Sequence, residues 1–221
     1  MSTPDGQVHL TYNGEVYNYR ELRRELEQKG YRFRTASDTE VILYAYEAWG
    51  RFCVERFEGM FAFAIWEAQA RRLFVARDRL GIKPVYYASA GGRFAFASEV
   101  RTILGMGIAP PRIDPIALHE YLAYQSIPAP RTLIDGIRML PPGTWMTVDA
   151  SGAVEEHAYW DLIESASSEA RGADRATILR RTGELLREST ELHLVSDVPV
   201  GVFLSGGIDS ALVAEIGRAH V

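Results

Sequence analysis

Six residues near the end of the chain, SGGIDS at positions 205–210, combine residue types that bind phosphate. Gly206 and Gly207 allow a sharp turn in which successive backbone N–H groups point at an anion. The apolar run before them at 200–204, with Val200, Val202, Phe203 and Leu204, is typical of a buried strand, and a helix starting near Asp209 would add its positive dipole end. The spacing therefore predicts a strand, a glycine turn and a helix that together bind phosphate oxygens.

No lysine follows these glycines and the Walker spacing is absent, so transfer of a γ-phosphate is a poor interpretation of the loop. The loop resembles instead the pyrophosphate loop of ATP pyrophosphatases, which use ATP to adenylate a substrate. A plain Gly-Gly turn is the alternative interpretation. It does not explain the apolar run or the flanking Ser205, Asp209 and Ser210.

The composition is that of an ordinary globular protein: 221 residues, 47% hydrophobic and 24% charged, enough for one large domain or one and a half. A net charge of −5 with mixed signs offers no basic face, so we expect no nucleic-acid or membrane partner. No apolar run reaches the length of a membrane span, and the polar start does not look like a signal peptide. The expected compartment is the cytoplasm.

The single cysteine, Cys53, excludes an internal disulfide and a CxxC metal cluster, and the five histidines are scattered. Cys53 stands in WGRFCVERF between Phe52 and Phe57 on a predicted helix, where a small buried thiol is expected. The sequence therefore predicts no metal site of its own.

The first fifty residues predict a strand end at 10–12, a turn at Asn13-Gly14 and then two helices. Each helix opens with residues spaced as in a capping box and closes at a glycine. These residues are Asn18, Glu21 and Gly30 for the first helix, and Ser37, Glu40 and Gly50 for the second.

From residue 59 the apolar period changes to two, which predicts successive antiparallel strands. Phe61, Phe63 and Ile65 alternate with the small Ala62 and Ala64, so both faces of this strand are apolar. Such strands suit two stacked sheets between layers of helix. Further strands are expected at 73–76, 85–88, 94–97, 145–148 and 154–159.

A polar stretch at 161–174 is the candidate linker, and an amphipathic helix at 178–192 follows it. A helix, a strand and one turn are too few elements to close a core, so this second domain is expected to be incomplete. The predicted organisation is a domain at 1–160, a linker at 161–174 and the start of a second domain at 175–221.

Six motifs together resemble glutamine-dependent asparagine synthetases in order and rough spacing, over nearly the whole chain. They are YNGEVYN at 12–18, SDTEV at 37–41, GMFAFAIW at 59–66, RDRLGIKPVYY at 77–87, ASEV at 97–100 and SDVPVGVFLSGGIDS at 196–210. The resemblance implies an α+β fold: an α/β/β/α four-layer sandwich of the N-terminal-nucleophile hydrolase type, acting as a glutaminase. A truncated α/β domain of the adenine-nucleotide-hydrolase-like type is implied to follow.

The resemblance also implies a nucleophilic cysteine at the mature N-terminus, whose α-amine activates its thiol. This chain begins with Met1 and Ser2, so the cysteine and an arginine-bearing loop are expected to precede it. Cys53 cannot replace that nucleophile, because an internal residue has no free α-amine. The chain alone is therefore expected to be inactive as a glutaminase.

Three residues carry the implied glutamine site. Asn13 and Gly14 match the family's oxyanion hole, where a side-chain amide and an unobstructed N–H converge on the developing charge; a plain Asn-Gly turn is the alternative. Asp38 matches the carboxylate that holds the α-amino group of glutamine, and it is also a first-turn acid that the helix dipole favours. Arg77 and Asp78 either lie near the glutamine pocket or form a surface ion pair.

The implied ATP site lies in the second domain, where Asp209 either orders the loop or reaches Mg²⁺ bound to ATP. In the implied reaction, glutamine gives glutamate and ammonia, and aspartate is activated as β-aspartyl-AMP and attacked by the ammonia to give asparagine. The implied partners are thus glutamine, aspartate and ATP, and a homodimer is compatible with the family. The ATP-binding residues are Leu204, Ser205, Gly206, Gly207, Asp209 and Ser210.

Two alternatives stay open. Related synthetases adenylate other carboxylates, and a non-catalytic glutaminase-like binding module belongs to a different functional class. A binding module predicts joint decay of Asn13, Gly14, Asp38 and the SGGIDS loop, and all are intact. The last six residues, IGRAHV at 216–221, read as one frame of a common sequencing adapter, which suggests an artefact of an assembled gene end.

Overall fold

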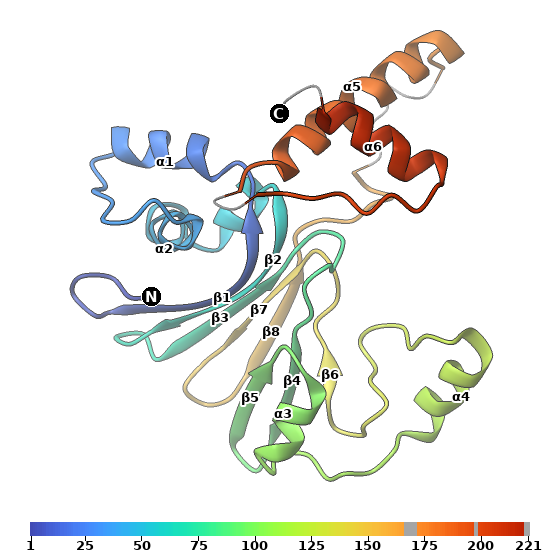
Figure 1. The fold of residues 1–221 in the computed structure, drawn as a ribbon. Helices are drawn as coiled ribbons and strands as arrows, with labels where there is room; N and C mark the ends of the chain where they lie inside the picture. The colour runs from blue at the N-terminus through green and yellow to red at the C-terminus, as the bar shows by residue number, and fades with distance from the viewer. Residues whose placement is uncertain (166–171, 197–198, 219–221) are drawn as a thin grey trace. The chain divides into compact units, whose positions relative to one another are not determined.

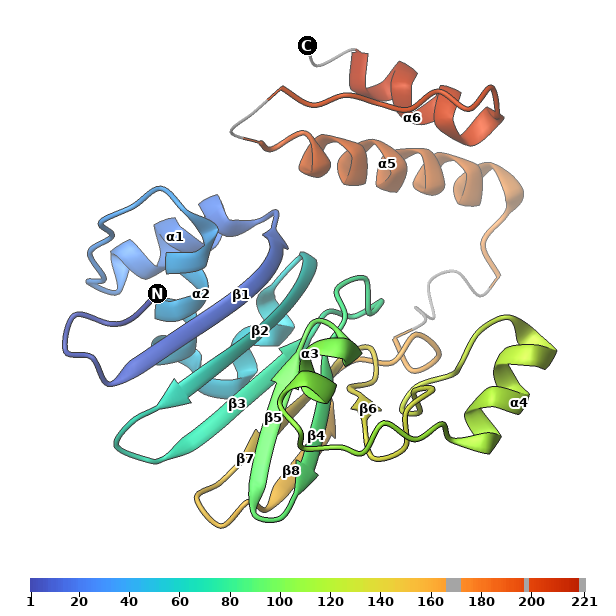
Figure 2. The same cartoon turned by 60° about the horizontal axis from the view of Figure 1, so that its bottom comes forward.

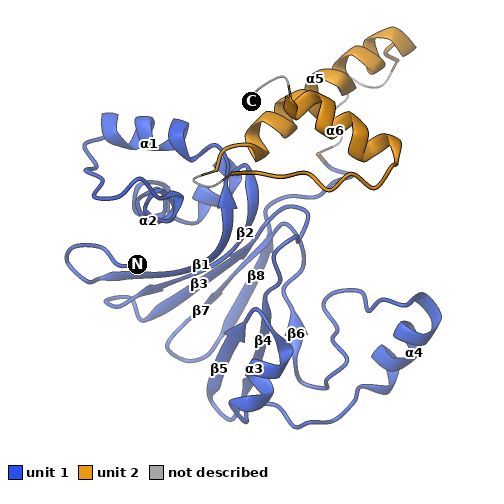
Figure 3. Cartoon of the chain, in the orientation of Figure 1, with its two compact units in different colours: residues 1–164 blue, residues 165–221 orange. Residues whose placement is uncertain are grey.

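The computed structural model describes residues 1–165, 172–196 and 199–218. Two compact units divide the chain, Met1–Glu164 and Ser165–Val221 (Figure 3). The division falls within the stretch 161–174 that the sequence suggests as a linker, of which residues 166–171 lie outside the described part.

The larger unit contains two antiparallel sheets (Figure 1). The first has the order β1-β2-β3-β7-β8, with β1 at Val8–Val16, β2 at Gly59–Glu67, β3 at Arg72–Arg77, β7 at Thr144–Val148 and β8 at Val154–Ala158. The second has the order β5-β4-β6, with β4 at Tyr86–Ala90, β5 at Arg93–Ala97 and β6 at Arg138–Met139. Antiparallel pairing of β4 with β5 and of β7 with β8 agrees with the strands expected at 85–88, 94–97, 145–148 and 154–159.

Three separate clusters of buried side chains give the order of the layers. Helices α1 and α2 pack on the first sheet, the two sheets pack on each other, and α3 packs on the second sheet (Figures 1 and 2). This order is the predicted α/β/β/α sandwich. The helices of this unit are α1 at Tyr19–Gln28, α2 at Asp38–Trp49, the 3₁₀ helix η1 at Gly50–Arg56, α3 at Val100–Gly105 and α4 at Pro115–Tyr124.

Strand β2 shows how the sequence produces these layers. Its large residues Phe61, Phe63 and Ile65 belong to the cluster beneath the helices, whereas Ala62 and Ala64 belong to the cluster between the sheets. Side chains alternate across a strand, so one face fills the helix layer and the other leaves room for the second sheet.

The prediction of a turn at Asn13-Gly14 is wrong, because β1 continues through both residues to Val16. Its register with β2 places Asn13 opposite Ala62 and Gly14 opposite Phe61. The turn dipeptide is overridden by nine residues of pairing with a neighbouring strand, which satisfies the backbone hydrogen bonds along the whole segment.

The prediction that Asn18 caps α1 with its side chain is also wrong. The Asn18 amide donates to the carbonyl of Arg56 at 2.9 Å, and its side-chain oxygen accepts from the N–H of Glu58 at 3.1 Å. The side chain therefore joins the start of α1 to the segment between η1 and β2. Such a contact lies 38–40 residues away along the chain, where a local capping pattern carries no information.

The predicted cap of α2 is confirmed, since the Ser37 hydroxyl accepts from the N–H of Thr39 at 3.1 Å. Glu40 is not its capping-box partner. It accepts instead from the backbone N–H groups of Arg34 and Thr35, at 2.9 and 2.7 Å. Burial raises the pKa of Glu40, but the hydrogen bonds from Thr35 and Arg34 outweigh it and leave the pKa below its usual value.

The smaller unit contains α5 at Arg175–His193 and α6 at Ile208–Arg218, which pack on each other. The predicted strand at 200–204 is wrong, because these residues have no regular structure and Phe203 is 99% exposed. A strand needs a neighbour to satisfy its backbone groups, and residues 172–196 and 199–218 offer helices only. None of the described helices is long and apolar enough to cross a membrane.

Candidate functional site

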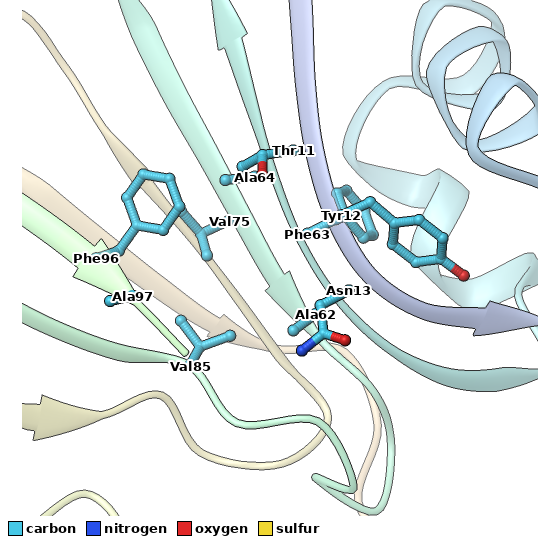
Figure 4. A pocket seen from close by; sticks show the side chains of 10 residues that line it. All are labelled: Thr11, Tyr12, Asn13, Ala62, Phe63, Ala64, Val75, Val85, Phe96 and Ala97. Carbon is cyan, nitrogen blue, oxygen red and sulfur yellow. The ribbon is translucent and has the colours of Figure 1, made fainter. Parts of the chain in front are cut away.

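Asn13 lines a small pocket between the two sheets, with a volume of about 70 Å³ open to water-sized groups. The pocket walls come from β1, β2, β3 and β5, and are mostly small or apolar, with Ala62, Ala64 and Phe96 among them (Figure 4). Within the described part of the chain, no residue forms a hydrogen bond with the Asn13 side chain, which is exposed. An amide with free donors beside an apolar wall is suited to a polar ligand that enters the pocket.

Gly14 follows Asn13 in β1 and lies opposite Phe61 of β2. Its φ of +148° is disfavoured for other residues, and a Cβ there would lie 2.1 Å from the carbonyl oxygen of Met60. No side chain fits without moving β2. The glycine therefore allows β1 and β2 to pack closely beside Asn13.

Asp38 is the first residue of α2, and its side chain is hydrogen-bonded to β1. Its Oδ2 atom accepts from the Tyr12 hydroxyl at 2.6 Å and from the N–H of Val16 at 3.1 Å. Asp38 and Gly14 are not among the residues that line the Asn13 pocket. The structure thus joins Asp38 to the strand that carries Asn13, but does not bring the two side chains into contact.

Tyr12 also belongs to this site, although no motif in the sequence singles it out. Burial raises the pKa of its hydroxyl, and the hydrogen bond to Asp38 raises it further, so Tyr12 remains a neutral proton donor. Figure 4 shows the Tyr12 and Asn13 side chains on opposite sides of β1. Side chains alternate between the two faces of a strand, so a strand that continues through YNGE places Tyr12 and Asn13 on opposite faces, with Tyr12 toward the helix layer.

Asp78 and Arg77 do not form a surface ion pair; both are buried. Asp78 accepts backbone N–H groups from Leu80, Ile82 and Lys83, at 3.1, 2.9 and 3.0 Å. Arg77 donates to three carbonyl oxygens, those of Gly81, Lys83 and Leu140, at 2.6–2.8 Å. Their side chains are thus engaged in shaping the loop after β3.

Cys53 is completely buried in η1, and burial raises the pKa of its thiol well above the usual range. The prediction of a small buried thiol is confirmed. Among the described residues, no group of three His, Cys, Asp or Glu side chains is arranged to hold a metal ion.

The SGGIDS loop lies at the start of α6 in the smaller unit, with Asp209 in the first turn. The Ser205 and Ser210 hydroxyls are 3.0 Å apart, and Ser210 also donates to the carbonyl of Gly207 at 3.1 Å. Gly206 has a φ of +81°, and an added Cβ would meet no atom within 4 Å. The loop therefore presents two hydroxyls and a helix N-terminus on an open surface, a set of groups that suits phosphate.

Comparison with protein families accounts for both units. The model of the glutamine amidotransferase domain matches residues 1–160. The chain belongs to this amidotransferase family. The asparagine synthase model matches residues 181–221.

Individual proteins similar to this chain include glutamine-hydrolyzing asparagine synthetases 1 and 3 of Bacillus subtilis strain 168. Asparagine synthetase 1 is 36% identical over 99% of the chain and asparagine synthetase 3 is 38% identical over 96%. The chain spans only 34% of the length of each. Among solved structures, glutamine phosphoribosylpyrophosphate amidotransferase from B. subtilis aligns with 99% of this chain and 46% of its own, with a TM-score of 0.52 and 17% identity, which supports the fold alone.

Proposed function

We propose that the chain is part of a glutamine-hydrolysing asparagine synthetase, an ATP-dependent ligase. The observation that carries the proposal is the succession, in one chain, of a match to the amidotransferase domain over 1–160 and a match to asparagine synthase over 181–221. An amidotransferase releases ammonia, and a synthetase that adenylates a carboxylate consumes it. The two activities together make an amide from glutamine, ATP and an acid.

The larger unit would bind glutamine at the end of β1. Asn13 contributes a side-chain amide with free donors and Gly14 would contribute its backbone N–H, so the pair would stabilise the oxyanion that forms on the glutamine amide. The Asp38 carboxylate would hold the α-ammonium group of glutamine. Two donors from β1 already fix its position.

The attacking thiol is not the one in this chain. Cys53 is fully buried and its raised thiol pKa keeps it protonated, so it neither reaches a substrate nor forms a thiolate. The nucleophile would therefore be a cysteine at the mature N-terminus of the complete enzyme.

The smaller unit would bind ATP at the SGGIDS loop. Ser205, Ser210 and the N-terminus of α6 offer donors to phosphate oxygens, and the space around Gly206 is open to receive them. ATP would supply the adenylyl group that makes the aspartate carboxyl electrophilic. Mg²⁺ would be held mainly by ATP, with Asp209 as the nearby carboxylate, since the described residues form no metal-binding cluster of their own.

The test uses the enzyme encoded by the complete reading frame. Aspartate-dependent exchange of pyrophosphate into ATP, and asparagine formation from either glutamine or ammonia, are expected. Exchange that depends on another carboxylate and not on aspartate would refute the assignment of the acceptor. Failure to release glutamate from glutamine would refute the amidotransferase half.

A further inference from the structure

The hydrogen bond between Tyr12 and Asp38 joins the strand of the oxyanion pair to the helix of the ammonium-binding carboxylate. The two residues lie 26 positions apart in the sequence, and the hydroxyl oxygen is 2.6 Å from Asp38 Oδ2. Asp38 Oδ2 also accepts a hydrogen bond from the backbone N–H of Val16 at 3.1 Å. Both donors belong to β1, the strand that carries Asn13.

These contacts leave the two carboxylate oxygens of Asp38 in different situations. Oδ2 accepts two hydrogen bonds, whereas for Oδ1 the one described donor is the Ser37 hydroxyl, at a long 3.4 Å. One donor would leave the carboxylate free to rotate, while two donors on the same oxygen restrict its plane. Oδ1 is therefore the oxygen left to receive a ligand.

Resting on the proposed function, we infer that Tyr12 is a positioning residue for glutamine: its hydroxyl orients the Asp38 carboxylate so that Oδ1 meets the α-ammonium group. Tyr12 itself does not touch the reacting amide, because its side chain packs on the helix-facing side of β1, away from Asn13. Adjacent residues of one strand thus serve the two ends of the substrate. Asn13 meets the γ-amide side and Tyr12 fixes the partner of the α-amino side.

The inference predicts a change in substrate selectivity and not only in rate. A glutamine analogue without the α-amine, 4-carbamoylbutanoate, makes no use of Asp38. In the complete enzyme, Tyr12→Phe should lower kcat/KM for glutamine hydrolysis by about tenfold, because a misplaced binding group weakens transition-state binding. The kcat/KM for the analogue should stay within about twofold of the wild-type value.

Tyr46→Phe is the matched control. The Tyr46 hydroxyl is also a buried donor to a carboxylate, that of Glu67, but it lies at the opposite end of the sheet from Asn13. This variant loses a similar hydrogen bond and should keep the wild-type preference for glutamine over the analogue. On an Asp38→Asn background, Tyr12→Phe should change glutamine hydrolysis by less than about twofold, because the two residues act through one contact.

Three results would overturn the inference. They are an equal loss for glutamine and analogue in Tyr12→Phe, a parallel loss of ammonia-dependent synthesis, and independent effects of Tyr12→Phe and Asp38→Asn. The first two would show that the hydroxyl supports the fold, and the third that it acts apart from Asp38. Failure of the proposed function is recognised separately, because the wild-type enzyme would then not hydrolyse glutamine.

Discussion

Replacement of Asp38 should separate the two half-reactions of the complete enzyme. Asp38→Ala removes a first-turn carboxylate from α2, which costs about 0.3–1 kcal/mol of favourable dipole interaction. It also deprives the Tyr12 hydroxyl and the Val16 N–H of their acceptor, which costs about 1–3 kcal/mol when such donors are shielded from water. Since Asp38 is half-buried, we expect a total near the lower end of the sum of these ranges.

The effect on glutamine should be larger than the effect on folding. Loss of one partner of a desolvated charge pair costs about 2–5 kcal/mol, because the other charge remains buried alone. At about 1.4 kcal/mol per factor of ten, this predicts at least a tenfold fall in kcat/KM for glutamine. Ammonia-dependent synthesis should stay near its wild-type rate, since it bypasses the glutamine site.

Asp38→Asn removes the negative charge of residue 38 but keeps an oxygen that accepts hydrogen bonds, so it separates these two contributions. The amide oxygen of asparagine still accepts from Tyr12 and Val16, so thermal stability should fall less than in Asp38→Ala, while the loss of glutamine-dependent synthesis should persist. Steady-state assays with the two nitrogen donors and a thermal melt measure these outcomes. Equal losses with glutamine and ammonia would refute the reasoning and make Asp38 structural, and no loss with either would remove it from the glutamine site.

Other expected outcomes concern the thiol, the loop and a buried acid. Cys53→Ala should leave glutamate release by the complete enzyme unchanged. The 221-residue chain should release no more glutamate than its own Cys53→Ala variant. A dependence of glutamate release on Cys53 in either assay would make Cys53 a nucleophile. Gly206→Val should abolish ammonia-dependent synthesis but spare glutaminase activity. The reason is that a β-branched residue is strained at a φ of +81° and would crowd the phosphate. Normal synthesis by this variant would assign the loop another role. Glu40→Gln should destabilise the fold at neutral pH. The pKa of Glu40 in the folded protein lies below its ordinary value of 4.5, so the ionised carboxylate stabilises the fold fully above pH 4.5. This stabilisation disappears as the pH falls through the folded-state pKa, and the urea melts of wild type and Glu40→Gln should therefore converge in acid. A difference in stability that stays constant with pH would contradict this role of the Glu40 charge.

The layered fold could be predicted from the sequence because each layer leaves a mark on the periodicity. The alternation of Phe61, Ala62 and Phe63 records two different environments on the two faces of β2. The cap at Ser37 is equally local, since donor and acceptor lie two residues apart. Features of this range depend on the backbone geometry of single elements.

The site was only partly predictable, because its hydrogen bonds join distant segments. Tyr12 and Asp38 meet through the packing of α2 on β1, and the buried partners of Arg77 come from as far away as Leu140. The apolar run before SGGIDS has strand composition, yet composition alone does not provide the neighbouring strand that would pair with it. The side-chain orientation of Asn13 follows from strand register, which the turn dipeptide concealed.

The carboxylate of Asp78 makes one cooperative unit of the loop after β3. Besides its three partners in the loop, it accepts the N–H of Phe61 in β2 at 3.3 Å, so a single side chain links the loop to the sheet. Leu80 and Ile82 nevertheless expose 67% and 55% of their surface. Protection of their amides from solvent hydrogen exchange thus depends on whether Asp78 stays in place and not on the burial of their own side chains. These amides should open together, as a group whose stability is that of the sheet rather than that of a surface loop.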